Sequence, residues 1–212
     1  TQALAIAREI GDRAGEGTIL GNLGNAYRSL GQYAKAVEHD TQALAIAREI
    51  GDKRLEGGIL GNLGVAYGAL GQHAKGIECK TQALAIHREI GNRQSEAFVL
   101  GNLGLTHLEY LHDAAAALPW LRQSVAAWDA IWADLATDRQ RVTFGDRTAP
   151  VKHARALQRA HARLGQPAEA LVCAERARSR AFELLLAQQR LKRQQQAPAA
   201  GRMPFSATSL DW

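Results

Sequence analysis

The sequence predicts an all-α solenoid, a row of stacked antiparallel helix pairs. Residues 1–12 return unchanged at 41–52 and with two changes at 81–92, so the chain repeats every 40 residues. A second segment, Leu-Gly-Asn-Leu-Gly, recurs at 20–24, 60–64 and 100–104. The repeats are rich in helix-forming residues and show no period-two alternation typical of strands. A fixed period of this size indicates units that bury their apolar faces only against their neighbours.

Each unit is expected to contain two helices. In the first complete unit, residues 17–30 carry a helical stripe of apolar residues spaced by three and four: Ile19, Leu20, Leu23, Ala26, Tyr27 and Leu30. Gly31 is expected to end this helix, because glycine adopts the left-handed conformation that closes a helix C-terminus. The second helix is expected over residues 33–50, with Gly51 ending it.

Glycines within the predicted helices indicate that the two helices of a unit cross closely. Gly24 and Gly64 are expected to face Ala36 and Gly76, respectively, on the second helix. An interior glycine costs about 1 kcal/mol of helix propensity relative to alanine. We expect close packing at the crossing point to offset that cost.

These residues resemble the tetratricopeptide repeat family. The family's positions are occupied in the first two units by Leu23-Gly24, Tyr27, Gly31, Ala36 and Ala43-Leu44, then by Leu63-Gly64, Tyr67, Gly71 and Ala83-Leu84. The resemblance covers residues 1 to about 110 and implies a right-handed superhelical solenoid with a concave binding groove. The family's basic unit has about 34 residues, so the longer unit here is similar to the variant in cell-polarity scaffolds and kinesin light chains.

The remaining chain is expected to depart from the regular repeat. In the third unit His107 replaces the tyrosine and Leu111 the hairpin glycine. We therefore divide the chain into three parts. Residues 1–136 form a repeat array that starts mid-repeat and holds three units, and residues 137–193 form a basic, degenerate fourth pair with helices over about 157–164 and 168–191. Residues 194–212 form a linker to a further C-terminal domain. Because the chain begins inside a repeat, we expect it to be a piece of a longer protein.

A second resemblance concerns the C-terminal third. Leu-Arg-Gln-Ser at 121–124, Val-Thr-Phe at 142–144 and the segment 174–185 are similar to the region that precedes a CHAT domain, a caspase-like peptidase domain. The chain departs from that pattern at Ala177, where glycine is expected, and at 148–150, where Thr-Ala-Pro interrupts an expected helix. The resemblance implies a peptidase domain beginning after about residue 205.

Composition excludes several classes of protein. No stretch approaches the roughly 18 apolar residues needed to cross a bilayer, and no secretory signal precedes the repeats. The net charge of +5 is uneven, since residues 137–202 hold 14 Lys or Arg against 5 Asp or Glu. These basic residues lack interleaved aromatics, so nucleic-acid binding is not favoured. The two cysteines lie far apart, which indicates thiols in a reducing compartment, and we expect a cytoplasmic protein.

No catalytic or metal-binding constellation is expected in this chain. A caspase-like site needs a cysteine thiolate beside a histidine base, but Cys79 and Cys173 fit helix faces rather than exposed turns. His107 and His112 lack further ligand types for zinc. We therefore expect no enzyme activity in this chain and no metal or cofactor.

The candidate binding residues are asparagines on the first helix of each unit. Asn22, Asn62 and Asn102 recur at one offset, and an amide can both donate to a peptide carbonyl and accept from its N–H. The alternative is that these amides bridge adjacent helices. The resemblance to polarity scaffolds implies peptide contact by Asn25 as well, and Arg28 is expected to select acidic ligands.

These observations favour a non-enzymatic scaffold that binds a peptide or protein segment in its concave groove. The second resemblance makes it the regulatory and recognition arm of a CHAT-type protein, in possible contact with its own C-terminal domain. The alternatives are the substrate-presenting part of a caspase-like cysteine peptidase, an adaptor of the kinesin-light-chain or polarity-scaffold kind, and nucleic-acid binding by the basic end.

Overall fold

The structure, a computed structural model, describes residues 2–145 and 148–196 and is helical throughout, with no strand in these ranges. The helices are α1 (Gln2–Glu9), α2 (Arg13–Ser29), α3 (Tyr33–Glu49), α4 (Lys53–Ala69), α5 (His73–Glu89), α6 (Arg93–Leu105), the π-helical turn η1 (Thr106–Tyr110), α7 (Ala114–Ala133), α8 (Asp138–Gly145), α9 (Thr148–Arg163) and α10 (Pro167–Gln196). The predicted all-α fold class is confirmed. The linker expected over 194–212 lies almost wholly outside the described residues.

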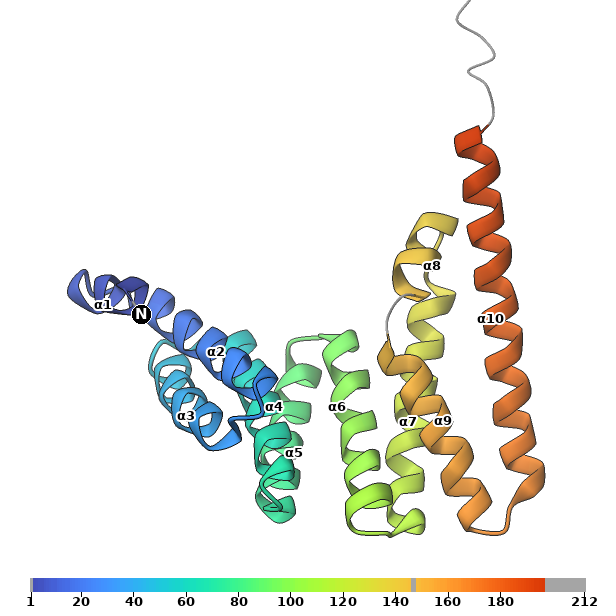
Figure 1. The fold of residues 1–212 in the computed structure, drawn as a ribbon, viewed down its shortest axis with the longest axis horizontal. Coiled ribbons are helices and arrows are strands. Elements are labelled where there is room, and N and C mark those ends of the chain that lie inside the picture. The colour runs from blue at the N-terminus through green and yellow to red at the C-terminus, as the bar shows by residue number, and fades with distance from the viewer. Residues whose placement is uncertain (1, 146–147, 197–212) are drawn as a thin grey trace, which may run out of the picture.

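Antiparallel hairpins follow one another along the row (Figure 1). At the start of α4, the Asp52 side chain accepts a hydrogen bond from the Leu55 N–H, at 2.9 Å, which satisfies one of the open donors of the first turn. At the end of α2, Gly31 adopts φ 71°, a left-handed conformation that favours glycine. The predicted helix ends at Gly31 and Gly51 are therefore each within two residues of the observed ones.

The close crossing predicted within a unit is present between α4 and α5. A Cβ added to Gly64 would lie 3.1 Å from the Gly76 carbonyl oxygen, and one added to Gly76 would lie 2.9 Å from the Gly64 oxygen. In both units the nearest side chain comes from the residue one turn further along the second helix. It is Lys80 for Gly64 and Asp40 for Gly24.

Ion pairs join each second helix to the first helix of the next unit. They recur at the 40-residue period and link Arg8 to Glu16 at 2.7 Å, Arg48 to Glu56 at 2.9 Å and Arg88 to Glu96 at 2.8 Å. Glu16 and Glu56 are buried, so their charges require these partners. The apolar clusters likewise span neighbouring units, as expected of a solenoid.

The third unit contains an extra residue in its first helix. The α-helical pattern of α6 changes to the π-helical turn η1, and the left-handed position of the hairpin moves from Leu111 to His112, which has φ 54°. The Arg163 guanidinium donates to the Leu108 carbonyl oxygen within this turn, at 2.6 Å. The hairpin thus closes without a glycine, and α7 begins at Ala114.

The pair α9 and α10 stacks on α6 and α7 as a fourth unit would. A Cβ on Gly101 would overlap the His153 ring of α9, just as one on Gly21 would approach Ile59 of α4 at 2.7 Å. The expected interruption at 148–150 is wrong, because α9 begins at Thr148 and Pro150 occupies its first turn. Proline is tolerated there since the first-turn N–H groups have no helical partner.

His153 docks α9 through a buried polar cluster. Its Nδ1 accepts from the Trp128 indole N–H at 3.2 Å and lies 2.9 Å from the Ser124 hydroxyl, which bonds the Ala97 carbonyl at 2.7 Å. Burial lowers the pKa of His153 to about 4, so the ring is neutral and can accept at Nδ1. Three elements, α6, α7 and α9, are joined at this point.

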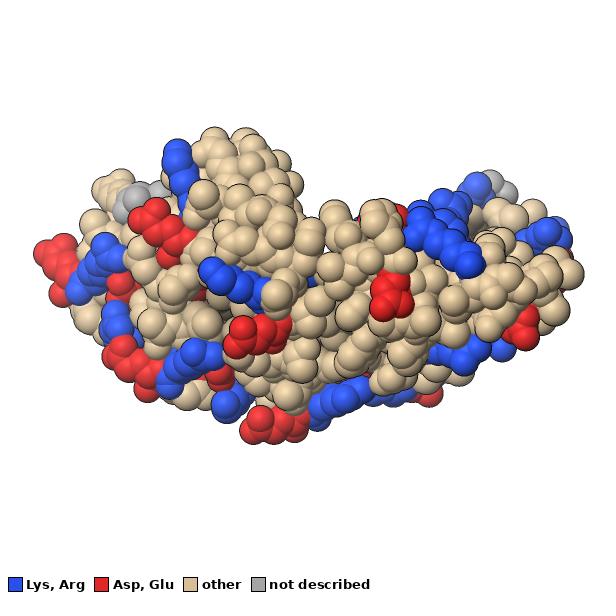
Figure 2. Space-filling model, turned by 90° about the horizontal axis from the view of Figure 1, so that it is seen from below, with Lys and Arg blue, Asp and Glu red and all other residues tan. Residues whose placement is uncertain are grey.

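The row bends toward its first helices. α2 contacts α4 directly, and α6 contacts α9, whereas α4 and α6, like α3 and α5, meet at most weakly. Figure 1 shows the two ends of the row, α1 and the α8–α10 region, rising on the same side. In Figure 2, acidic and basic residues mix over α1–α5, while basic residues predominate at the α9–α10 end.

Candidate peptide-binding face

The candidate peptide-binding face is formed by the first helices of the units, α2, α4 and α6, on the inner side of the bend. Asn22 of α2 is exposed, and Asn62 of α4 and Asn102 of α6 are half-buried. Among the residues that the structure describes, the three side-chain amides make no hydrogen bond. The contacts therefore give no support to the alternative in which these amides bridge adjacent helices.

Asn25 and Arg28 lie together on α2. The Nη2 atom of Arg28 donates a hydrogen bond to the Oδ1 atom of Asn25. The other terminal nitrogen of Arg28 lies 4.0 Å from the carboxylate of Asp40, and only 21% of the Arg28 side chain is exposed. The structure thus directs the Arg28 charge toward a buried carboxylate as well as toward the groove, which the sequence reasoning did not anticipate.

Asp40 is a buried carboxylate that sequence reasoning missed. It is completely buried, and neither of its oxygens accepts a hydrogen bond within the described part of the chain. Burial raises its pKa to about 7, and the charge of Arg28 only partly opposes that rise. A signal was available, because the 40-residue period aligns Asp40 with Lys80, two unlike residues in otherwise similar units. In the third unit, where the extra residue shifts the register by one, Leu121 lies against Gly104 in the same way.

Lys80 occupies the same position one unit later. Its ammonium is buried and donates to the Thr106 hydroxyl at 2.7 Å. Burial lowers the pKa of Lys80 to about 8. Gly68 stands where the first unit has Arg28, and a Cβ there would lie 4.0 Å from the Lys80 Nζ. The smaller residue on α4 therefore makes room for the longer residue on α5.

Two glycines next to Asn62 expose the backbone of α4. A Cβ added to Gly58 or to Gly61 would meet no atom within 4 Å. Packing therefore does not explain them, unlike Gly64, although each costs helix propensity. Bare backbone of this kind permits close approach by another chain. One unit later, Phe98 takes the place of Gly58 and is 46% exposed.

The two thiols have the wrong environment for a nucleophile. Burial raises the pKa of both Cys79 and Cys173, whereas a reactive cysteine requires a lowered pKa. In the ranges 2–145 and 148–196, no three His, Cys, Asp or Glu residues are grouped to hold a metal. None of the helices in these ranges combines the length and apolarity needed to span a bilayer.

Together the stacked hairpins and the polar inner face define a helical-repeat protein of the kind that binds other proteins. The profile of the tetratricopeptide repeat family matches residues 1–49 and 56–130, more than half of the sequence. The chain therefore belongs to the tetratricopeptide repeat family, and its repeats form a protein–protein interaction scaffold. Families of this type are typically non-catalytic.

Solved structures with similar folds carry the same superhelix. The protein BtubC (BKLC) from P. vanneervenii superposes with a TM-score of 0.65 at 18% identity, covering 94% of this chain and 72% of that one. A putative kinesin light chain from Podospora anserina with nearly identical TPR-like repeats gives a TM-score of 0.61 at 21% identity, covering 91% and 85%. A single-substitution variant of that kinesin light chain gives 0.63 at 23%, covering 84% and 82%. A comparison with curated proteins finds no match to this sequence.

Proposed function

We propose that this chain binds an extended peptide or protein segment along the inner face of the array, through Asn22, Asn62 and Asn102. The observation that supports this most directly is that the three amides recur at one offset and have no partner within the described residues. An unpartnered amide can pair with the N–H and C=O groups of an extended backbone. Affinity would then depend little on the ligand's sequence.

The glycines of α4 fit this proposal. Gly58 and Gly61 leave the helix backbone uncovered beside Asn62, so a ligand can approach the middle of the face closely. Asn25 and Arg28 would contact the segment at the α2 end, where the arginine favours an acidic residue. The other end, near Phe98, would favour an apolar one.

The test is removal of the three amides. The array would first be used to capture ligands from an extract, and the bound segment mapped and synthesised. We expect the triple variant Asn22→Ala, Asn62→Ala and Asn102→Ala to bind this peptide at least tenfold more weakly with unchanged helicity by circular dichroism. The matched control replaces three exposed glutamines that make no side-chain hydrogen bond to the described residues, Gln42, Gln94 and Gln189, by alanine. Equal weakening in both triple variants, or loss of helicity in the first, would contradict the proposal.

The resemblance at residues 121–124, 142–144 and 174–185 supports a more specific role. In this role, the scaffold is the recognition and regulatory arm of a CHAT-type protein in the cytoplasm, and ligand binding positions or releases a caspase-like domain. Alternatively, the array presents substrates to that domain. Reading the gene beyond Trp212 tests both versions, because a following domain without a His/Cys dyad would contradict them. That outcome would leave the peptide-binding face untouched.

A second candidate is an adaptor of the kinesin-light-chain kind. The two neighbours described as a kinesin light chain share this superhelix, but at 21% and 23% identity the likeness concerns the fold alone. Co-purification with a motor or polarity complex, in place of a peptidase domain, would favour this candidate.

A further inference from the structure

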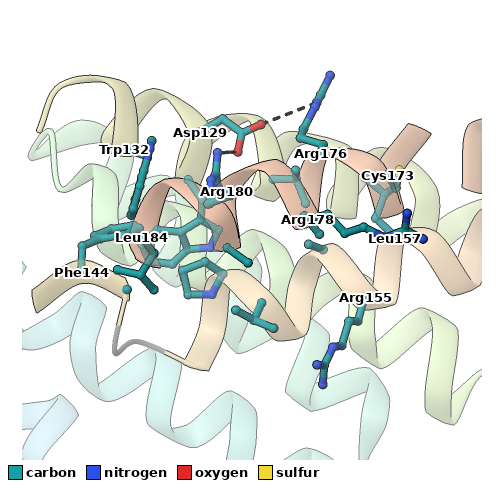
Figure 3. A pocket seen from close by; sticks show the side chains of 18 residues that line it. Asp129, Trp132, Phe144, Arg155, Leu157, Cys173, Arg176, Arg178, Arg180 and Leu184 are labelled. Carbon is teal, nitrogen blue, oxygen red and sulfur yellow. Dashed lines mark hydrogen bonds and ion pairs between the residues drawn. The ribbon is translucent and has the colours of Figure 1, made fainter. Parts of the chain in front are cut away.

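A separate cavity lies at the opposite end of the row from α1, between α7, α8, α9 and α10. Its volume is about 350 Å³, within the range of roughly 300–1,000 Å³ typical of small-molecule sites. Its walls are mainly apolar and include Trp128, Trp132, Phe144, Leu157 and Leu184. Figure 3 shows Trp132, Phe144 and Leu184, from three different helices, close to one another. Such a partly open, mainly apolar cavity favours an apolar guest, whose burial removes apolar surface from water.

Small residues form part of the cavity wall. Ala154 of α9 and Ala177 and Ala181 of α10 line it. The helix α10 packs against α8 and α9, but its backbone meets that of α7 at most weakly. Long side chains bridge these two helices instead, through the pairing of Arg176 and Arg180 with Asp129. The cavity therefore lies where α7 and α10 do not pack closely.

Arginines lie at the rim of this apolar cavity, and Figure 3 shows the Arg155 and Arg176 side chains extending outward on opposite sides of it. Arg155, Arg176, Arg178 and Arg180 line the cavity, and Asp129 is the only acidic residue among the lining groups that the structure describes (Figure 3). Asp129 bonds Arg180 and lies 3.6 Å from Arg176, which leaves these two partly neutralised. Arg178 pairs only with the exposed Glu175, at 2.7 Å. Within the described ranges, Arg155 has no acidic partner. The lining therefore carries an excess of positive charge.

We propose that this cavity binds a single-chain amphiphile with an anionic head, such as a long-chain carboxylate. The tail lies between the aromatic rings, and the head pairs with Arg155 and Arg178. Arg176 and Arg180 hold α10 to α7 through Asp129 and shape the wall. Charge complementarity favours the carboxylate over a neutral or cationic head. An alkyl chain also fits this apolar cavity better than it fits the exposed polar face that carries the three asparagines.

The test measures binding of alkyl carboxylates of 8 to 14 carbons to the full chain, each below its micelle concentration. Trp128 and Trp132 line the cavity, so brominated chains would quench their fluorescence, and calorimetry gives the dissociation constant. We expect about fourfold tighter binding per added methylene until the cavity is filled. The alcohol of equal length should bind at least tenfold more weakly, and the trimethylammonium analogue weaker still.

Variants separate head from tail. Arg155→Gln with Arg178→Gln should weaken carboxylate binding about tenfold and leave alcohol binding unchanged. Ala154→Leu should fill the cavity and weaken both ligands, whereas Ala162→Leu, at an exposed site on the same helix, should weaken neither. Equal affinity for the three head groups, or no effect of Ala154→Leu in a variant with native helicity, would overturn the proposal. Binding of an acidic peptide in the cavity, with no binding of the carboxylates, would also overturn it by making the cavity a protein-docking pocket.

Discussion

Neutralising Asp40 should remove a pH dependence from the stability of the first unit. The folded state raises the pKa of Asp40 from its ordinary value of 3.8 to about 7, so the folded chain binds a proton more tightly than the unfolded chain. Stability from this group is therefore complete below pH 3.8 and is lost as the pH rises toward 7. The rise corresponds to roughly 4 kcal/mol, at 1.36 kcal/mol per pH unit. This is an upper value, because Arg28 and local rearrangement relieve part of it.

Asp40→Asn keeps the shape of the side chain and removes its ionisation. We expect the variant to be more stable than the parent by roughly 2–4 kcal/mol at pH 8, with a difference that shrinks toward zero as the pH falls to about 4. Urea unfolding, followed by circular dichroism at intervals of one pH unit between these limits, measures this difference. Glu38→Gln on the same helix is the control, since Glu38 is exposed and should give a curve parallel to that of the parent. Parallel pH curves for Asp40→Asn and the parent would refute the reasoning.

Three further predictions concern the second unit. Gly64→Leu should destabilise the chain by about 1–3 kcal/mol through overpacking, because even a Cβ there would lie 2.6 Å from Lys80 Cγ. Gly61→Ala should instead raise the thermal midpoint, because a Cβ at Gly61 meets no atom within 4 Å and alanine adds about 1 kcal/mol of helix propensity. Unchanged unfolding of the first variant would contradict the close crossing with Gly76. Lys80→Met should stabilise the chain at pH 7 by up to about 3 kcal/mol, less the lost bond to Thr106, since burial lowers the Lys80 pKa from 10.5 to about 8. The gain should disappear as the pH rises from 8 to 10.5, where the parent lysine is neutral when folded, and a constant gain across that range would count against burial of the charge.

The sequence was sufficient for the regular part of the fold because its signals are periodic. Helix ends at Gly31 and Gly51 follow from glycine's access to the left-handed region, and the inward faces follow from spacings of three and four. The side chains that meet these glycines were not predictable in this way. They depend on how far one helix slides along the other, which brings Asp40 against Gly24 and Lys80 against Gly64.

Departures from the period were harder to predict. The extra residue in η1 moves the left-handed position to His112, and no sequence rule for hairpin glycines gives that shift. α8 and the cavity beside it result from packing between segments far apart in the chain, such as Phe144 and Leu184. Composition indicated only that this region is basic.

The candidate binding residues were identifiable from the repeat, but their environment was not. Periodicity placed Asn22, Asn62 and Asn102 on equivalent positions of first helices, and the structure adds that their amides lack partners in the described residues. Arg28 was grouped with them from its position alone. Its proximity to Asp40 could be found only from the helix crossing.

Nearly identical units raise the question of what fixes their order. The ion pairs between units use the same residue types each time, so Arg48 would suit Glu16 or Glu96 as well as Glu56. Only positions that differ between units can distinguish one register from another, and the buried ones carry the largest penalties when mismatched. Asp40 beside Arg28 and Lys80 beside Gly68 form such a pair of positions. Exchanging the two second helices would bury the Lys80 ammonium against Arg28 and leave Asp40 without a cation. The buried charges that weaken each unit thus discriminate against misassembly of the array.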